Sequence, residues 1–208
     1  MAQGIMYHDG NRRLQDQFGS RQISDRLEAK LAHTQFTSDD KAFIESRIVF
    51  FLATADAKGR STCSHKGGAF GFVRVVAPDE LAFPDYDGNG MFLSIGNILV
   101  NPNVGLLFID FEQPRRLRVN GTASVWRHDP LIKHTVGAQL IVRVQARAIF
   151  PNCPRYVPKM HLIEPSIYTP RDGIDPPEPG WKSSPEFKDA VPRRQEAYGP
   201  SDEQATGE

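Results

Sequence analysis

One short segment of the chain carries several side chains that can act on a ligand. In an extended strand alternate side chains share a face, so Ser64 and Lys66 point to one side, and Cys63 and His65 to the other. Two glycines follow the lysine, and their bare backbone lets an anionic or planar ligand approach its ammonium group closely. The alternative interpretation is an exposed strand that runs into a flexible loop.

A second segment, residues 83–97, leads from a strand end through a glycine-rich turn into the start of a helix. Free backbone N–H groups and the positive end of the helix dipole meet there, which favours a phosphate-sized anion. Ser94 and Asn97 lie about one helical turn apart and can add hydrogen bonds from the same face. Leu93 stands where a Gly-x-Gly-x-x-Gly motif needs its third glycine, and no Walker A lysine follows. A turn that only caps a structural helix is the alternative.

Arginines alternate with apolar residues in a third segment, which places Arg116 and Arg118 on one strand face. Two guanidinium groups on one face either bind an anion or solvate an exposed sheet edge. The 6 histidines show no spacing typical of metal ligands, so we predict no metal site. A serine hydrolase has no support either, because no Gly-x-Ser-x-Gly motif is present.

The composition is that of an ordinary globular protein, with 208 residues of which 39% are hydrophobic and 24% charged. The 25 basic residues balance the 25 acidic ones, which is not the positive charge expected of a nucleic-acid binder. Apolar runs are much shorter than the ~20 residues of a membrane-spanning helix. We therefore expect a cytoplasmic protein that binds neither nucleic acid nor a membrane. Cys63 and Cys153 lack a C-x-x-C spacing and are expected to be free, buried thiols.

Short β-branched and aromatic runs separated by turn residues must position these segments. A helix is expected to begin after Thr37, because residues 37–40 have the spacing of a capping box, and a second helix over 91–100. Tight turns between strands indicate a mainly antiparallel sheet, which hides its edges best by closing into a barrel. The predicted strands are residues 49–55, 60–65, 70–76, 81–84, 104–111, 117–125 and 138–150.

Three parts of the chain differ in composition. Residues 1–36 have the periodic hydrophobic residues of an amphipathic helix or two helical pieces, and form an N-terminal extension. Residues 37–165 form the barrel domain. Residues 166–208 are rich in proline and have few large hydrophobic residues, so we interpret them as an arm that lies over the domain or a partner subunit and frays after about Pro200, with disorder throughout as the alternative.

Several short motifs of the barrel domain together carry a family resemblance. They are Ser-His-Lys-Gly-Gly at 64–68, Gly-Phe-Val at 71–73, Phe-Pro-Asp-Tyr-Asp-Gly-Asn at 83–89, Ser-Ile-Gly-Asn at 94–97, Asn-Pro-Asn-Val-Gly-Leu-Leu-Phe at 101–108, Arg-Val-Asn-Gly at 118–121 and Phe-Pro-Asn-Cys-Pro-Arg-Tyr at 150–156. With these motifs the sequence resembles the FMN-binding split-barrel group related to pyridoxamine 5'-phosphate oxidase, and within it the flavin-nucleotide-binding branch. The resemblance implies a mainly β, antiparallel split barrel of Greek-key type with a few peripheral helices. It also implies a homodimer with FMN at the subunit interface and a small-molecule substrate.

By the same resemblance, FMN-binding residues fall on the first strand hairpin, the glycine-rich turn, the following helix and the arginine strand. Lys66, Cys153 and Arg155 are the implied substrate-facing residues, and no catalytic residue is assigned. The implied cofactor-binding residues are Thr62, Cys63, Ser64, His65, Lys66, Asp85, Asn89, Gly90, Met91, Ser94, Asn97 and Arg116.

Two departures from the oxidase bear on function. The oxidase carries an Arg-Lys pair at the start of the helix, whereas residues 90–93 here are uncharged, so Lys66 or Arg116 is left to meet the phosphate charge. The oxidase's C-terminal Arg-x-His substrate motif is also missing, and Arg155 stands near its place.

The sequence therefore predicts a flavin-dependent oxidoreductase that acts on an unknown small substrate or a reduced nicotinamide. A non-catalytic flavin-binding store or sensor is a second hypothesis, and a barrel that binds haem or a deazaflavin is a third. The residues do not separate the first two, because a bound flavin is chemically competent wherever a substrate can reach it.

Overall fold

The computed structural model describes residues 5–174 and 176–191, and its core is one seven-stranded antiparallel sheet. The strand order is β2-β1-β5-β6-β7-β4-β3, so sequence neighbours pair as hairpins except where the chain passes from β2 to β3 and from β4 to β5. The strands are β1 (Val49–Ala55), β2 (Ser61–Gly67), β3 (Arg74–Ala77), β4 (Glu80–Tyr86), β5 (Asn103–Asp110), β6 (Arg115–Trp126) and β7 (Ala138–Asn152).

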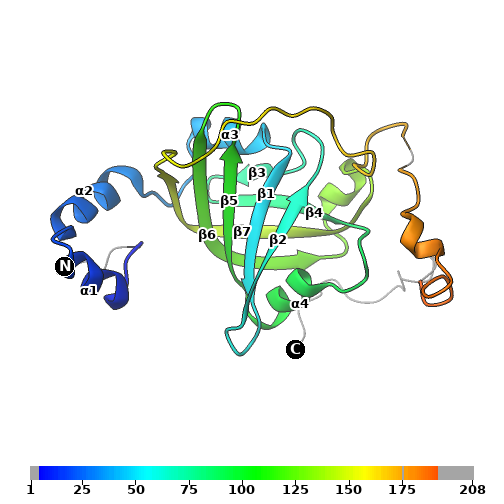
Figure 1. Ribbon diagram of the computed structural model, residues 1–208, viewed down its shortest axis with the longest axis horizontal. Coiled ribbons are helices and arrows are strands. Elements are labelled where there is room, and N and C mark those ends of the chain that lie inside the picture. The colour runs from blue at the N-terminus through cyan, green and yellow to red at the C-terminus, as the bar shows by residue number, and fades with distance from the viewer. Residues whose placement is uncertain (1–4, 175, 192–208) are drawn as a thin grey trace.

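The sheet curls until strands that are far apart in its order come together. Four strands separate β2 from β4 in the sheet, yet the Nζ atom of Lys66 on β2 lies 3.3 Å from a carboxylate oxygen of Asp85 on β4. Figure 1 shows β3, β4 and β7 crossing behind β1, β2, β5 and β6. The architecture is the split barrel that the sequence predicts, which confirms the fold class.

Large apolar side chains fill the barrel. On β1 alternate residues are buried, and Phe50 packs against Phe83 and Phe108 with ring centroids 5.0 and 5.2 Å apart. Burying one such ring contributes about 1.5–3 kcal/mol, so this cluster is a main source of stability. Helices α3 (Ser38–Glu45) and α4 (Leu93–Val100) lie at opposite ends of the barrel, and a short 3₁₀ helix, η1 (Pro130–His134), precedes β7.

Most predicted elements are present, and three expectations need correction. The strand predicted over 70–76 is only β3, because residues 69–72 form a turn in which Gly71 has a positive φ of 76°. Helix α4 begins at Leu93, two residues later than predicted, because Phe92 adopts a left-handed conformation. Both cysteines are exposed, since Cys63 lies on the outer face of an edge strand and Cys153 follows the end of β7.

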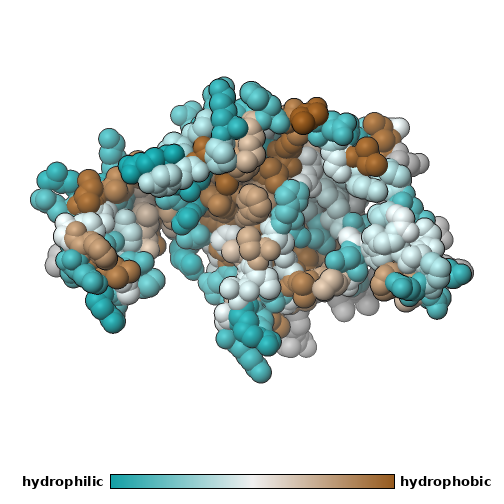
Figure 2. All heavy atoms as spheres, viewed as in Figure 1, coloured by the Kyte–Doolittle hydropathy of each residue, from teal (hydrophilic) through white to brown (hydrophobic). Residues whose placement is uncertain are grey.

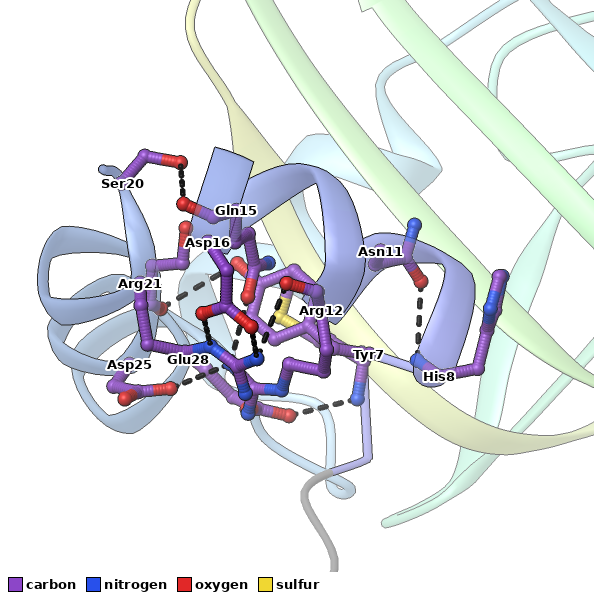
Figure 3. Close-up of polar contacts among 12 residues, drawn as sticks. Tyr7, His8, Asn11, Arg12, Gln15, Asp16, Ser20, Arg21, Asp25 and Glu28 are labelled. Atoms are coloured by element: carbon purple, nitrogen blue, oxygen red, sulfur yellow. Dashed lines mark hydrogen bonds and ion pairs between the residues drawn. The ribbon is translucent and has the colours of Figure 1, made fainter. Parts of the chain in front are cut away.

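The N-terminal extension forms two helices, α1 (Asp9–Gln17) and α2 (Arg21–Leu31), that lie beside the barrel (Figure 1). Ion pairs connect them, and Arg12 and Arg21 lie 2.6 Å from Asp25 and Asp16 respectively (Figure 3). Most of the periodic hydrophobic residues that predict this pair of helices are exposed, namely Leu14, Phe18, Ile23 and Leu27, and the fifth, Leu31, is half-buried.

The C-terminal region continues from β7 over the top of the barrel and then descends along one side as far as the 3₁₀ helix η2 (Gly180–Ser183) (Figure 1). The predicted fraying after about Pro200 lies outside the described residues. Within residues 5–174 and 176–191, no helix is long and apolar enough to cross a membrane.

A buried carboxylate joins the N-terminal extension to the barrel. Asp40 accepts hydrogen bonds from the Thr37 backbone N–H and hydroxyl at 3.0 and 2.7 Å, and its carboxylate lies 2.8 Å from the His33 Nε2 atom. His33 also pairs through its backbone with Ile149 on β7. Burial raises the pKa of Asp40, but the Thr37 hydrogen bonds and the His33 contact outweigh it, and the net pKa lies below its ordinary value.

We expect Asp40→Ala to lower the free energy of unfolding by about 1–3 kcal/mol near pH 7, since charged hydrogen bonds are lost. Because the folded-state pKa lies below the unfolded one, this stabilisation is present above pH about 4 and is lost as the pH falls through the folded-state pKa. Urea unfolding at several pH values measures it. Asp39→Ala, at an exposed carboxylate of the same helical turn, is the control. Equal effects of the two substitutions would contradict the role of Asp40.

Candidate functional site

A cavity of about 780 Å³ lies where β2, the end of β4, the start of α4 and the C-terminal region meet. Its volume is within the range of small-molecule and cofactor sites. Eight of the predicted cofactor-binding residues line it: Ser64, His65, Lys66, Asp85, Asn89, Gly90, Met91 and Ser94.

Strand β2 supplies the polar wall of the cavity. Ser64 and Lys66 are register partners of the buried Leu52 and Phe50 on β1, so they share the inner face of the sheet, as their alternation predicts. The Ser64 hydroxyl lies 2.9 Å from the hydroxyl of Ser94 in the first turn of α4. Two hydroxyl groups and one ammonium group therefore converge on the cavity from two elements.

An ion pair between Lys66 and Asp85 joins edge strand β2 to β4 at this cavity. The side chains of Lys66 and Asp85 are 21% and 10% exposed, so both are largely desolvated. Burial raises the pKa of Asp85, and the charge and hydrogen bond of Lys66 oppose the rise without cancelling it. The strand register shifts directly after Asp85, and such a bulge re-aims side chains at a strand end. The pair offers one cation and one acceptor to a polar ligand.

The glycine-rich turn enters α4 through a strained residue. Phe92 precedes the helix with φ 48° and ψ 27°, and it is the only residue other than glycine with positive φ among the described residues. A left-handed conformation costs a non-glycine residue of the order of 1–3 kcal/mol, and such residues cluster at binding sites. No side chain caps the helix, so backbone N–H groups at its start are left for a ligand.

Two further predicted residues, Thr62 and Asn97, lie next to the cavity and hold α4 against β2. The Asn97 side-chain amide donates to the hydroxyl groups of Thr54 and Thr62 at 3.0 and 3.3 Å. Ser94 and Asn97 therefore both face the β1–β2 hairpin, as their spacing predicts. Neither Thr62 nor Asn97 lines the cavity, and their contacts fix α4 against β2.

Other predicted site residues lie away from this cavity. Arg116 is on β6, where its Nη2 atom donates to the backbone carbonyl of Cys153. Cys63, Cys153 and Arg155 do not line the cavity either. Since the resemblance places the cofactor between subunits, the roles of these residues stay predictions.

The C-terminal arm, defined here as residues 176–191, covers one side of the same cavity, which sequence reasoning only half anticipated. The sequence predicts an arm over the domain or a partner subunit, and in this chain Trp181 of the arm lines the cavity of its own domain. Sequence reasoning missed Lys182 and Phe187, which also line it. The only sequence signal for them is a lysine and a large ring in a proline-rich segment, and this composition does not indicate which residues they contact.

The fold is a split barrel, and its cavity has the size of a small-molecule or cofactor site. The family description "Pyridoxamine 5'-phosphate oxidase" matches residues 36–166, and the chain belongs to this family. No curated protein matches the chain.

Solved structures with similar folds include proteins described by different ligands. A candidate pyridoxamine 5'-phosphate oxidase from Lactobacillus delbrueckii is 21% identical, with a TM-score of 0.47 over 57% of this chain and 95% of that one. The haem storage protein HutZ from Vibrio cholerae is 20% identical, with a TM-score of 0.40 over 54% and 90%. An FMN-binding protein from Syntrophomonas wolfei is 10% identical, with a TM-score of 0.41 over 67% and 97%.

Removing the ammonium group of Lys66 tests its electrostatic coupling to Asp85. In Lys66→Met we expect the Asp85 pKa to rise further and the free energy of unfolding near pH 7 to fall by about 1–3 kcal/mol, because a buried carboxylate loses its partner. A carboxyl group whose folded-state pKa lies above its unfolded-state pKa destabilises the fold as the pH rises past about 4. The loss of unfolding free energy in Lys66→Met should therefore become smaller as the pH is lowered toward 4.

Carboxyl-carbon NMR titration of Asp85 and urea unfolding measure the two effects. Lys58→Met, at an exposed lysine of the β1–β2 turn, is the control. An unchanged Asp85 titration in Lys66→Met would contradict the coupling.

Proposed function

We propose that the protein binds FMN in this cavity and acts as a flavin-dependent oxidoreductase on a small substrate or a reduced nicotinamide. The observation that carries the proposal is the meeting of an uncapped helix start with Lys66, two serine hydroxyls and an apolar wall around one cavity. FMN is a flat ring system with a polar edge and a phosphate tail, and it needs this set of surfaces.

Different residues would bind different parts of FMN. The start of α4 and the Ser94 hydroxyl would hold the phosphate, since backbone N–H groups and a helix dipole favour an anion. Lys66 adds positive charge to a site whose helix lacks the oxidase's Arg-Lys pair. Ser64 and the Lys66–Asp85 pair can hydrogen-bond the polar edge of the ring. When bound, the flavin supplies hydride transfer.

Turnover separates an enzyme from a flavin store or sensor. Anaerobic titration with NADH and with NADPH, followed by a small acceptor, is the decisive measurement. Stoichiometric bleaching and repeated turnover support the oxidoreductase. A flavin that stays oxidised with both nicotinamides and with small reduced substrates would contradict the oxidoreductase and favour the flavin store or sensor.

Haem is the second candidate, and one observation favours it. His65 is one of the residues around the cavity, and its ring packs edge to face against Phe51 on the outer face of the sheet. An imidazole is a common axial ligand of haem iron, so a haem held by this side chain would lie at the outer face. The absorption spectra of the protein mixed with FMN, with a deazaflavin and with haem distinguish these ligands directly. A Soret band that shifts and sharpens in the wild type but not in His65→Ala would replace the flavin proposal by haem binding.

We expect the wild type to bind FMN and Lys66→Met to bind it about 10- to 100-fold more weakly, because a charge-assisted hydrogen bond contributes about 1.5–3 kcal/mol. Quenching of FMN fluorescence during titration measures the Kd. Lys58→Met should bind as the wild type does. Equal Kd values for Lys66→Met and the wild type would remove Lys66 from the site.

We further propose a homodimer formed through the outer face of β1 and β5. Phe51 is the register partner of Leu107 on this face, and Ile109 follows two residues along β5. Figure 2 shows hydrophobic side chains gathered in the middle of the face where these strands lie in Figure 1. Contiguous apolar surface of this kind is typical of a protein–protein interface.

We expect Leu107→Glu to convert the dimer to a monomer, because the substitution buries an unpaired charge in an apolar interface. Light scattering coupled to size-exclusion chromatography measures the mass. Val76→Glu, at an exposed apolar residue of β3, should stay dimeric. A monomeric wild type, or a dimeric Leu107→Glu, would contradict this interface.

A further inference from the structure

We infer that Trp181 of the C-terminal arm contacts the ring of the bound ligand in its own chain, and that an ion pair between Lys182 and Asp87 holds it there. The inference rests on the proposed flavin binding and deepens it by assigning the wall that faces β2 and α4.

The ion pair fixes the arm at the end of β4. The ammonium group of Lys182 contacts the carboxylate of Asp87, and the lysine side chain is only 10% exposed. Lysine side chains seldom lose that much contact with water unless they are paired. Asp87 directly follows β4 and lies two residues beyond Asp85, so the arm is held beside the carboxylate that pairs with Lys66.

The arm is folded locally, so it holds its side chains in defined positions. The Lys182 N–H donates to the Pro179 carbonyl at 2.9 Å within η2. Turns follow in which the N–H groups of Phe187 and Val191 donate to the carbonyls of Ser184 and Phe187 at 3.1 and 3.0 Å. Trp181 and Phe187 pack edge to face, with centroids 6.0 Å apart and an angle of 79°.

Both sides of the cavity leave apolar surface uncovered. Trp181 and Phe187 line it from the arm and are still 42% and 48% exposed. Across the cavity, Met91, Phe92 and Leu93 are 61%, 51% and 57% exposed. Apolar side chains thus line the cavity from two elements and remain exposed to solvent. A flat, apolar ring bound between them would cover this surface. A tryptophan is the larger of the two rings on the arm, and stacking on it is the contact we assign.

The chemistry of the ligand follows from the two kinds of wall. The β2 and α4 side supplies hydroxyls, a lysine and helix N–H groups, whereas the arm supplies rings. The ligand class is therefore an anionic molecule with a planar aromatic ring system. A ring covered by Trp181 is screened from solvent on that side, which restricts reaction on that face to small molecules.

The test uses the full-length protein, freed of bound flavin and titrated with FMN. We expect Trp181→Leu to raise the Kd about 3- to 10-fold, as lost aromatic stacking predicts, and to brighten bound FMN, whose fluorescence a stacked indole quenches. Trp126→Phe removes the other tryptophan, which does not line the cavity, and should change neither quantity.

The ion pair is tested separately. We expect Lys182→Met to raise the dissociation rate of FMN and to increase quenching of bound FMN by iodide, because the arm loses its attachment. Lys188→Met, at an exposed lysine of the same arm, is the matched control. Circular dichroism and thermal unfolding check that all variants fold.

The outcomes are distinct. Weaker binding and brighter, more accessible FMN in Trp181→Leu and Lys182→Met, with both controls unchanged, support the inference. Wild-type affinity and fluorescence in these two variants overturn the inference while the proposed flavin binding stands. A wild type that binds no FMN overturns both.

Discussion

The meeting of β2 with β4 is the constraint on which the candidate site depends. Four strands lie between those of Lys66 and Asp85 in the sheet order, and only the curl of the barrel brings their charged atoms to 3.3 Å. A largely buried ion pair is a weak source of stability, because desolvation offsets most of the attraction. Its position at the cavity therefore fits a binding role better than a purely structural one. The same curl brings α4 against β2, where Ser64 meets Ser94.

Local sequence signals predicted the parts of this arrangement that depend on neighbouring residues. The capping box of Thr37 and Asp40 predicted the start of α3, and the alternation of side chains along a strand predicted that Ser64 and Lys66 share one face of β2. The spacing of Ser94 and Asn97 placed both on one face of α4, because three residues make about one helical turn. These predictions succeeded because backbone periodicity alone determines them.

The remaining features depend on tertiary contacts that no short segment encodes. Gly121 shows why: the register shifts beside it, and a Cβ there would lie 2.1 Å from the Gln145 carbonyl oxygen, so β6 needs glycine only because β7 packs there. The left-handed Phe92 is likewise imposed by its surroundings, since its own preference is against that conformation. The pairing of Lys182 with Asp87 joins residues 95 positions apart, and net charge and composition carry no information about it.

The edge position of β2 leaves backbone groups beside the candidate site. Among the described strands β2 pairs only with β1, so one side of its backbone lacks a strand partner. Exposed strand edges present rows of N–H and C=O groups, which proteins must cover or use. The heteroatoms of a flavin ring alternate donors and acceptors along one edge, so they can pair with such a row. A ligand held there would contact the backbone of β2, its Lys66 side chain and the rings of the arm together, and each surface would recognise a different part of the molecule.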